Sequence, residues 1–174
     1  MLLCFALQCA PAKMPQGDVL SFWTGFKVQV PAEACLRRFE GPDYDVFYFY
    51  RSNTDKEPLL VVYAGYGAPF PLSNRADDLY WSKEHETLCE GIRFETVHQN
   101  GLRFISGGCS NGVAKTREVL IKQDSDDRHD SSACLHCYYK SVSEADALFA
   151  DSIIAAVQPG PTYNPPPPMV KKCP

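Results

Sequence analysis

The amino-acid sequence predicts an α+β fold: a largely antiparallel sheet of about six or seven strands with a C-terminal helix packed on one face. Two apolar runs, residues 44–50 and 59–63, follow one another with only a short polar turn between them. An Asn-Gly step at 100–101 separates two alternating runs, as in a hairpin. A long helical pattern with an apolar face begins only near Ser143.

The first predicted elements lie before residue 42. Residues 25–30 alternate apolar and polar side chains, which is typical of a half-buried strand. Residues 32–39 are predicted to form a short helix, because Pro31 suits the first helical position and Gly41 ends the segment.

The next two apolar runs predict a buried hairpin. Residues 44–50 are aromatic on both faces, and residues 59–63 return as a continuous apolar strand. The aromatic run could also stack sugars or bases, but a strand covered on both sides explains it better. The prolines within residues 65–71 then interrupt the sheet.

The hairpin around the Asn-Gly step leads to a covalent prediction. If the inward faces meet, Phe94 lies opposite Phe104. The same register places Cys89 opposite Cys109. Opposed residues at a non-hydrogen-bonded position are about 4.5 Å apart between Cα atoms, which suits a disulfide. We therefore predict a Cys89–Cys109 bridge.

The last third of the chain contains two further strands and the helix. Residues 115–122 favour a strand, and residues 135–139 form the last one. Ser143 is the expected N-cap of the helix, with Asp146 three residues on as a variant of a capping box. Pro159 and the glycine after it are expected to end this helix. Its apolar face is predicted to contain Leu148, Ile153, Ile154 and Val157.

The 174 residues are expected to form one domain between two appendages. Residues 1–12 are uncharged, with small residues at positions 10 and 12, and predict a signal-peptide remnant. A lipid tether at Cys9 is the alternative to cleavage. Residues 13–160 form the predicted α+β domain, and residues 161–174 form a proline-rich tail.

Cysteine content and charge indicate the compartment and the class of partner. Cleavage after residue 12 leaves an even number of cysteines, which predicts disulfides and a periplasmic or secreted location. No later segment is apolar for long enough to be a transmembrane segment. The formal net charge is -4 and the Lys and Arg residues are scattered, so nucleic acid is not the expected partner.

Residues 108–112 match the G-x-S-x-G pattern of a hydrolase nucleophile elbow. Ser110 would be the nucleophile, His136 the base, and Asp126 or Asp127 the acid. The elbow requires a sharp strand-to-helix turn in a doubly wound sheet, whereas this chain predicts hairpins. A turn between strands is the favoured interpretation, and we predict no catalytic residue.

Cys134 and Cys137 form a C-x-x-C at the head of a strand, so their side chains are expected on opposite faces and not as a redox pair. A zinc site with His129 and His136 would need a second ligand cluster, which the sequence lacks. The acidic loop 124–130 lacks the glycine and distal glutamate of a calcium site. No metal and no cofactor is predicted.

Two irregular segments, residues 63–70 and 124–130, have the composition of protein-binding loops. Aromatic residues on a Gly/Pro-rich loop are typical of binding surfaces, although a lid over the sheet would have the same composition. The acidic loop can meet a basic cleft or imitate the charge of a substrate. The predicted partner-binding residues are Tyr66, Phe70, Trp81, Asp124, Asp126 and Asp127.

Residues 134–140 followed by residues 143–157 resemble the closing strand and helix of Mog1/PsbP-like α/β sandwiches. The chain also resembles small exported bacterial proteins, among them periplasmic immunity proteins of interbacterial toxins. This resemblance implies binding to a protein partner, a toxin or enzyme that the protein inhibits. A small secreted serine hydrolase using Ser110 is the alternative; an envelope protein with residues 161–174 as a spacer is another.

Overall fold

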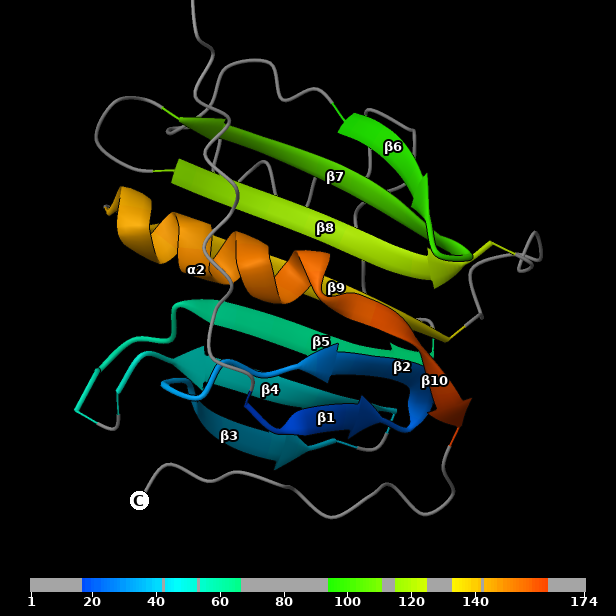
Figure 1. The fold of residues 1–174 in the computed structure, drawn as a ribbon, viewed down its shortest axis with the longest axis horizontal. Coiled ribbons are helices and arrows are strands. Elements are labelled where there is room, and N and C mark those ends of the chain that lie inside the picture. The colour runs from blue at the N-terminus through cyan, green and yellow to red at the C-terminus, as the bar shows by residue number, and fades with distance from the viewer. Residues whose placement is uncertain are drawn as a thin grey trace, which may run out of the picture.

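In the computed structural model, the described residues form two antiparallel sheets and a helix (Figure 1). The described ranges are 17–41, 43–52, 54–66, 94–110, 115–124, 133–141 and 143–162. The predicted signal segment and Cys9 lie outside them, as does nearly all of the proline-rich tail. Five predicted functional residues are outside as well: Phe70, Trp81, Cys89, Asp126 and Asp127.

The larger sheet contains seven strands in the order β3-β4-β5-β9-β8-β7-β6. Their bounds are β3 Cys35–Glu40, β4 Tyr44–Tyr50, β5 Leu60–Tyr66, β6 Phe94–Gln99, β7 Leu102–Ser110, β8 Lys115–Gln123 and β9 Ala133–Ser141. All neighbouring strands are antiparallel. Strands β3 to β5 form one meander and β6 to β9 another, and the two meanders join where β5 pairs with β9.

The smaller sheet has the order β1-β2-β10, and the helix α2 precedes its last strand. The bounds are β1 Val19–Phe22, β2 Thr24–Gln29, α2 Glu144–Ala155 and β10 Val157–Thr162. Figure 1 shows α2 lying across β8 and β9, beside β2. The prediction of a largely antiparallel sheet with a C-terminal helix is confirmed. The described fold contains more sheet than a balanced α+β protein.

Side chains alternate along β9 and divide the larger sheet into two faces. Leu135, Cys137 and Tyr139 belong to the main core beneath α2 and the smaller sheet, and we name this side the helix face. Cys134 lies on the other side, the opposite face, in a separate small cluster with Leu120. The two cysteines of the C-x-x-C therefore point to opposite faces, as predicted.

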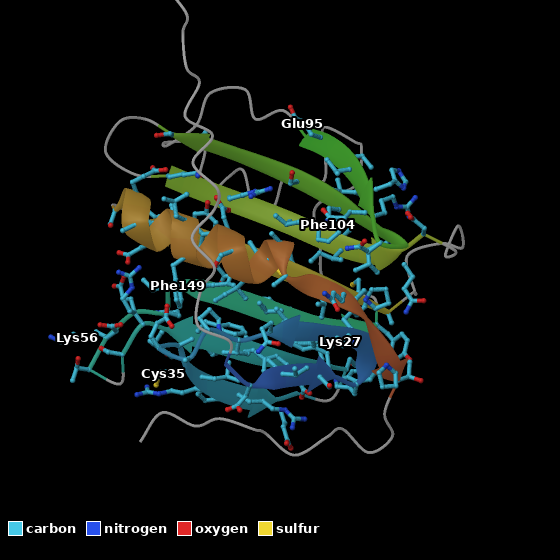
Figure 2. The ribbon with its side chains drawn as sticks, viewed as in Figure 1. Lys27, Cys35, Lys56, Glu95, Phe104 and Phe149 are labelled. Atoms are coloured by element: carbon cyan, nitrogen blue, oxygen red, sulfur yellow. The ribbon has the colours of Figure 1, made fainter. Side chains whose placement is uncertain are left out.

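Helix α2 begins as its sequence predicts. The Oγ of Ser143 accepts a hydrogen bond from the backbone N–H of Asp146 at 3.4 Å. The prediction for its apolar face is partly wrong, because Leu148 is 58% exposed and its neighbour Phe149 is buried instead. Figure 2 labels Phe149 on the side of α2 that faces the larger sheet.

The predicted helix at residues 32–39 is wrong, because this segment forms strand β3 after a turn. The N–H of Ala34 donates to the carbonyl of Pro31 at 3.0 Å, and β3 then pairs with β4 along its length. The Arg37 guanidinium lies 4.9 Å from the ring centroid of Tyr50 on β4. Ladder bonds and such cross-strand contacts outweigh helix propensity, which differs by at most about 0.7 kcal/mol per ordinary residue.

A two-residue turn joins β6 to β7. Gln99 lies opposite Leu102, so the loop contains only Asn100 and Gly101. The φ angles of these two residues are 54° and 75°. Positive φ at both central positions defines a type I′ turn, for which Asn-Gly is the preferred sequence. The predicted hairpin is therefore confirmed.

The register predicted for this hairpin is wrong. Val97, and not Phe94, lies opposite Phe104, which is a shift of three positions. The predicted pairing of Phe94 with Phe104 centres the hairpin on Gln99, whereas the two-residue turn centres it between Asn100 and Gly101. The pairing that placed Cys89 opposite Cys109 fails with that register. Because Cys89 lies outside the described residues, the disulfide itself stays a prediction.

Strand β10 is a second departure from the sequence-based expectation. The helix ends at Ala155, before the predicted stop at Pro159, and the chain continues as an extended strand paired with β2. Its prolines, Pro159 and Pro161, cannot donate to a ladder. They are tolerated because β10 is an edge strand of the smaller sheet.

Replacing Gly101 with alanine should lower the free energy of unfolding by about 1 kcal/mol, because a Cβ disfavours positive φ. A Cβ added at this position would meet no atom within 4 Å, so backbone strain is the dominant effect. Urea denaturation measures the change. Asn100→Gly is the matched control, since glycine accepts the same φ. A loss in the control as large as in Gly101→Ala would contradict this explanation.

Candidate functional site

One end of the molecule gathers segments that are distant in sequence (Figure 1). β5 ends at Tyr66 beside the start of β9, and Gln123 at the end of β8 lies opposite Leu102 at the start of β7. The β1–β2 and β6–β7 turns lie at this same end. We name this surface the turn end; its described members are Trp23, Tyr66, His98 and Asp124.

Two aromatic rings stand together at the turn end. The centroids of Trp23 and Tyr66 are 5.1 Å apart, with the rings tilted by 57°. Tyr66 is 50% exposed and Trp23 is half-buried. Tyr66 is one of the binding residues predicted from the sequence, and Trp23 is not. The sequence signal that could have indicated Trp23 is the glycine two residues after it, since glycine is typical of turns. In the structure Gly25 has a φ of 88°, at the start of β2.

Asp124, a predicted binding residue, is held in place at the turn end. Its Oδ1 lies 2.7 Å from the Nδ1 of His98, and its backbone N–H donates to the carbonyl of Gly101 at 3.0 Å. The side chains of His98 and Asp124 are 62% and 34% exposed. The structure therefore brings Tyr66 and Asp124 to the same end of the molecule, each on a regular strand or just after one.

Ser110 and His136 are not brought together. Ser110 is the last residue of β7, opposite Lys115, on the helix face. His136 lies opposite Leu120 and projects from the opposite face. The next described element after β7 is another strand, β8, and not a helix. This arrangement lacks the nucleophile–base contact of a serine hydrolase.

Glu118 and His136 form a buried pair on the opposite face. Glu118 Oε1 is hydrogen-bonded to His136 Nε2, and the ring of Tyr63 stacks at 6.0 Å from the His136 ring. Burial lowers the pKa of His136 below its ordinary 6.5; it outweighs the hydrogen bond and the charge of Glu118, which act in the other direction. His136 is therefore neutral near pH 7.

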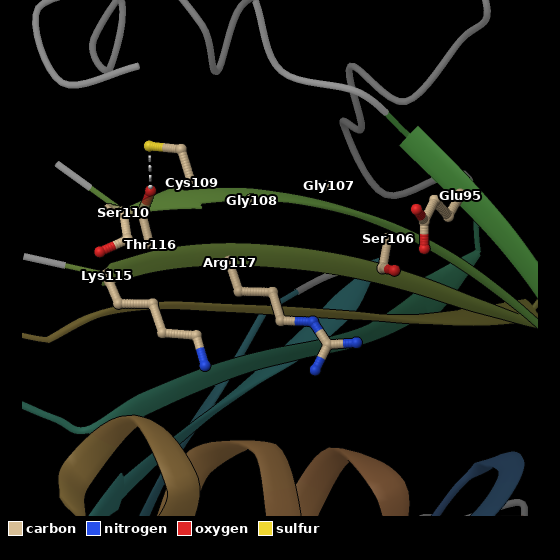
Figure 3. Close-up of a pocket in the computed structure, with 9 residues that line it drawn as sticks. All are labelled: Glu95, Ser106, Gly107, Gly108, Cys109, Ser110, Lys115, Thr116 and Arg117. Atoms are coloured by element: carbon tan, nitrogen blue, oxygen red, sulfur yellow. Dashed lines mark hydrogen bonds between the residues drawn. The ribbon is translucent and has the colours of Figure 1, made fainter. Parts of the chain in front are cut away.

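A polar groove of about 540 Å³ runs beside β7, near Ser110. Its described lining residues are Glu95, Ser106, Gly107, Gly108, Cys109, Ser110, Lys115, Thr116 and Arg117. In Figure 3, Lys115 and Arg117 extend away from β7, toward α2. Ser110 and Cys109 were singled out from the sequence, but the groove was not predicted, because it depends on the pairing of β7 with β8.

Asp151 on α2 binds both cationic side chains that border the groove. Its carboxylate lies 3.1 Å from Lys115 Nζ and 2.8 Å from Arg117, and it accepts a hydrogen bond from Tyr139 at 2.9 Å. Burial alone would raise the pKa of Asp151, but these donors outweigh burial and hold it below its ordinary value. These contacts connect Asp151 on α2 to side chains on β8 and β9, so a structural role explains the cluster.

The C-x-x-C cysteines are buried in separate environments. The Sγ of Cys134 donates to the carbonyl of Gly65 at 3.6 Å. Burial raises the pKa of the Cys137 thiol, which makes it a poor nucleophile. Among the described residues, no group of three or more His, Cys, Asp or Glu side chains could hold a metal ion. His129, considered as a zinc ligand, lies outside these residues.

Comparison with protein-family models and with curated proteins finds no match for this chain. The resemblance to Mog1/PsbP-like sandwiches therefore stays a prediction. Within the described ranges, no helix has the length and apolar character needed to cross a membrane.

Stability should fall as the pH drops below about 6.5, because unfolded His136 takes up a proton that the folded state resists. The unfolded state then binds more protons, so the stability contributed by neutral His136 is present above this pH. It is lost below it, by at most about 1.4 kcal/mol per pH unit. Urea denaturation from about pH 7.5 to 5 measures this dependence.

His136→Gln should flatten this pH dependence, whereas His98→Gln, a change at the exposed histidine, should leave it intact. An NMR titration of the His136 ring in the unmodified protein gives the same information if the variant does not fold. A ring that titrates at or above pH 6.5 would contradict the assignment.

Proposed function

We propose that this protein is an exported, non-enzymatic binding protein, most concretely a periplasmic immunity or inhibitor protein that blocks a partner toxin or enzyme. The turn end is its proposed contact surface. The observation that carries the proposal is the convergence of the Trp23–Tyr66 aromatic pair and the His98–Asp124 pair at one end of the molecule.

The chemistry of these residues suits protein recognition. Tryptophan and tyrosine provide large, rigid contact areas with one polar atom each, and they are enriched among residues that dominate binding energy. Asp124 offers a carboxylate whose position is fixed before binding, so little side-chain entropy is lost on association. The seven-stranded sheet holds Tyr66 and Asp124 at the ends of paired strands.

The alternative, a small serine hydrolase using Ser110, receives less support from the same geometry. The proposed base, His136, projects from the other face of the sheet and is engaged by Glu118. A fluorophosphonate probe that labels Ser110 in the native protein, with loss of hydrolysis in Ser110→Ala, would favour the hydrolase instead.

Binding measurements with surface variants test the proposal. A tagged form of the full chain is used to isolate a stoichiometric protein from the periplasm, and the affinity of the purified pair is then determined. Tyr66→Ala and Trp23→Ala should each weaken binding by roughly tenfold or more, as truncation of central aromatic residues does.

Leu148→Ala is the matched control, because Leu148 is a comparably exposed apolar residue on α2. This variant should bind with unchanged affinity. Equal losses in all variants, or the recovery of a small molecule in place of a protein, would overturn the proposal.

A further inference from the structure

Three basic side chains form one row across the larger sheet near the turn end. His98 on β6 is paired with Arg103 on β7, and Arg103 is paired with Lys122 on β8. Directly opposed residues in an antiparallel ladder project from the same face, with Cβ atoms about 5 Å apart. The three side chains, named here the basic row, therefore stand side by side on the opposite face.

Arg103 and Lys122 form no ion pair within the described part of the chain. The Nε of Arg103 is also buried and makes no hydrogen bond there. Like charges placed directly opposite one another destabilise a sheet. Arg103 and Lys122 therefore repel one another, and the Arg103 Nε–H is a hydrogen-bond donor with no acceptor among the described residues.

One acidic residue beside the row, Asp124, is already paired with His98. Asp124 lies just after the end of β8, two positions after Lys122, and its Oδ1 is 2.7 Å from the Nδ1 of His98. It is not within ion-pair distance of Arg103 or Lys122. The ion-pair partner of Asp124 among the described residues is therefore His98, and neither Arg103 nor Lys122.

The apolar surface next to the basic row should strengthen the attraction between its cations and an anion. Ile105 and Leu120, the next pair along β7 and β8 on the same face, pack in the small apolar cluster that also contains Cys134. Arg103 and Lys122 are themselves half-buried. Charges that border an apolar, partly dry surface interact more strongly with an anion than fully solvated charges do.

We infer that Arg103 and Lys122 bind a tetrahedral oxyanion, a phosphate or sulfate group, on the opposite face of the sheet. The guanidinium presents a planar fork of donors that fits two oxygens, and the ammonium adds a point charge from the neighbouring strand. An anion between them replaces their mutual repulsion with two attractions. The inference does not depend on the protein partner proposed above.

Titration of the purified full chain with inorganic phosphate, sulfate and O-phosphoserine tests the inference. All titrations are done at one ionic strength set with chloride, and acetate serves as the carboxylate control. Saturable amide shifts in the NMR spectrum should centre on Arg103 and Lys122. If inorganic phosphate or sulfate binds, a free anion is sufficient to occupy the site. If only O-phosphoserine binds, the site requires a phosphorylated organic ligand.

Arg103→Gln and Lys122→Gln should each weaken phosphate binding by about tenfold or more, since each removes charge-assisted hydrogen bonds. Each should also leave the thermal midpoint unchanged or raised, because the repulsion is relieved. Lys140→Gln is the matched control: Lys140 is on the same face of β9, opposite the uncharged Thr116. This control should bind phosphate normally.

Two results would overturn the inference. One is a response to phosphate, sulfate and O-phosphoserine no larger than the response to chloride. The other is a lowered thermal midpoint in both glutamine variants, which would mean that the two cations are already satisfied within the fold.

Discussion

The antiparallel pairing of β5 with β9 is the contact on which the rest of the molecule depends. It joins two meanders that are separate along the chain, with Val62 opposite Cys137, both buried. A three-stranded meander such as β3 to β5 needs a hydrophobic face, or packing against a helix, to be stable on its own. Joining the meanders creates one seven-stranded sheet, whose helix face is wide enough to accept α2 and the smaller sheet.

A second long-range pairing completes this arrangement. After α2 crosses the sheet, β10 pairs with β2, so the C-terminal part of the described chain is bound to its N-terminal part. Much of the helix face is therefore buried in the main core. The two surfaces proposed above for binding are the turn end, which carries Tyr66 and Asp124, and the opposite face, which carries the basic row. Each is assembled from strands that meet only in the folded sheet.

Local patterns in the sequence predicted the elements whose causes are local. The Asn100-Gly101 turn and the Ser143 cap depend on a few adjacent residues, and both form as expected. Residues 32–39 were predicted as a helix because Pro31 and Gly41 resemble helix boundaries, and the pairing with β4 that makes β3 a strand is not a local signal. The Trp23–Tyr66 contact and the basic row were not predictable for the same reason. They require knowing which strands are neighbours and in which register.

Native-state hydrogen exchange tests most directly the claim that the β5–β9 pairing unites the described elements into one cooperative unit. Amides along β5 and β9 should exchange only through global unfolding, with a free energy equal to that from urea denaturation. Exchange of the β3–β5 meander at a clearly lower free energy than the β7–β9 meander would contradict the account, because the two halves would then open independently.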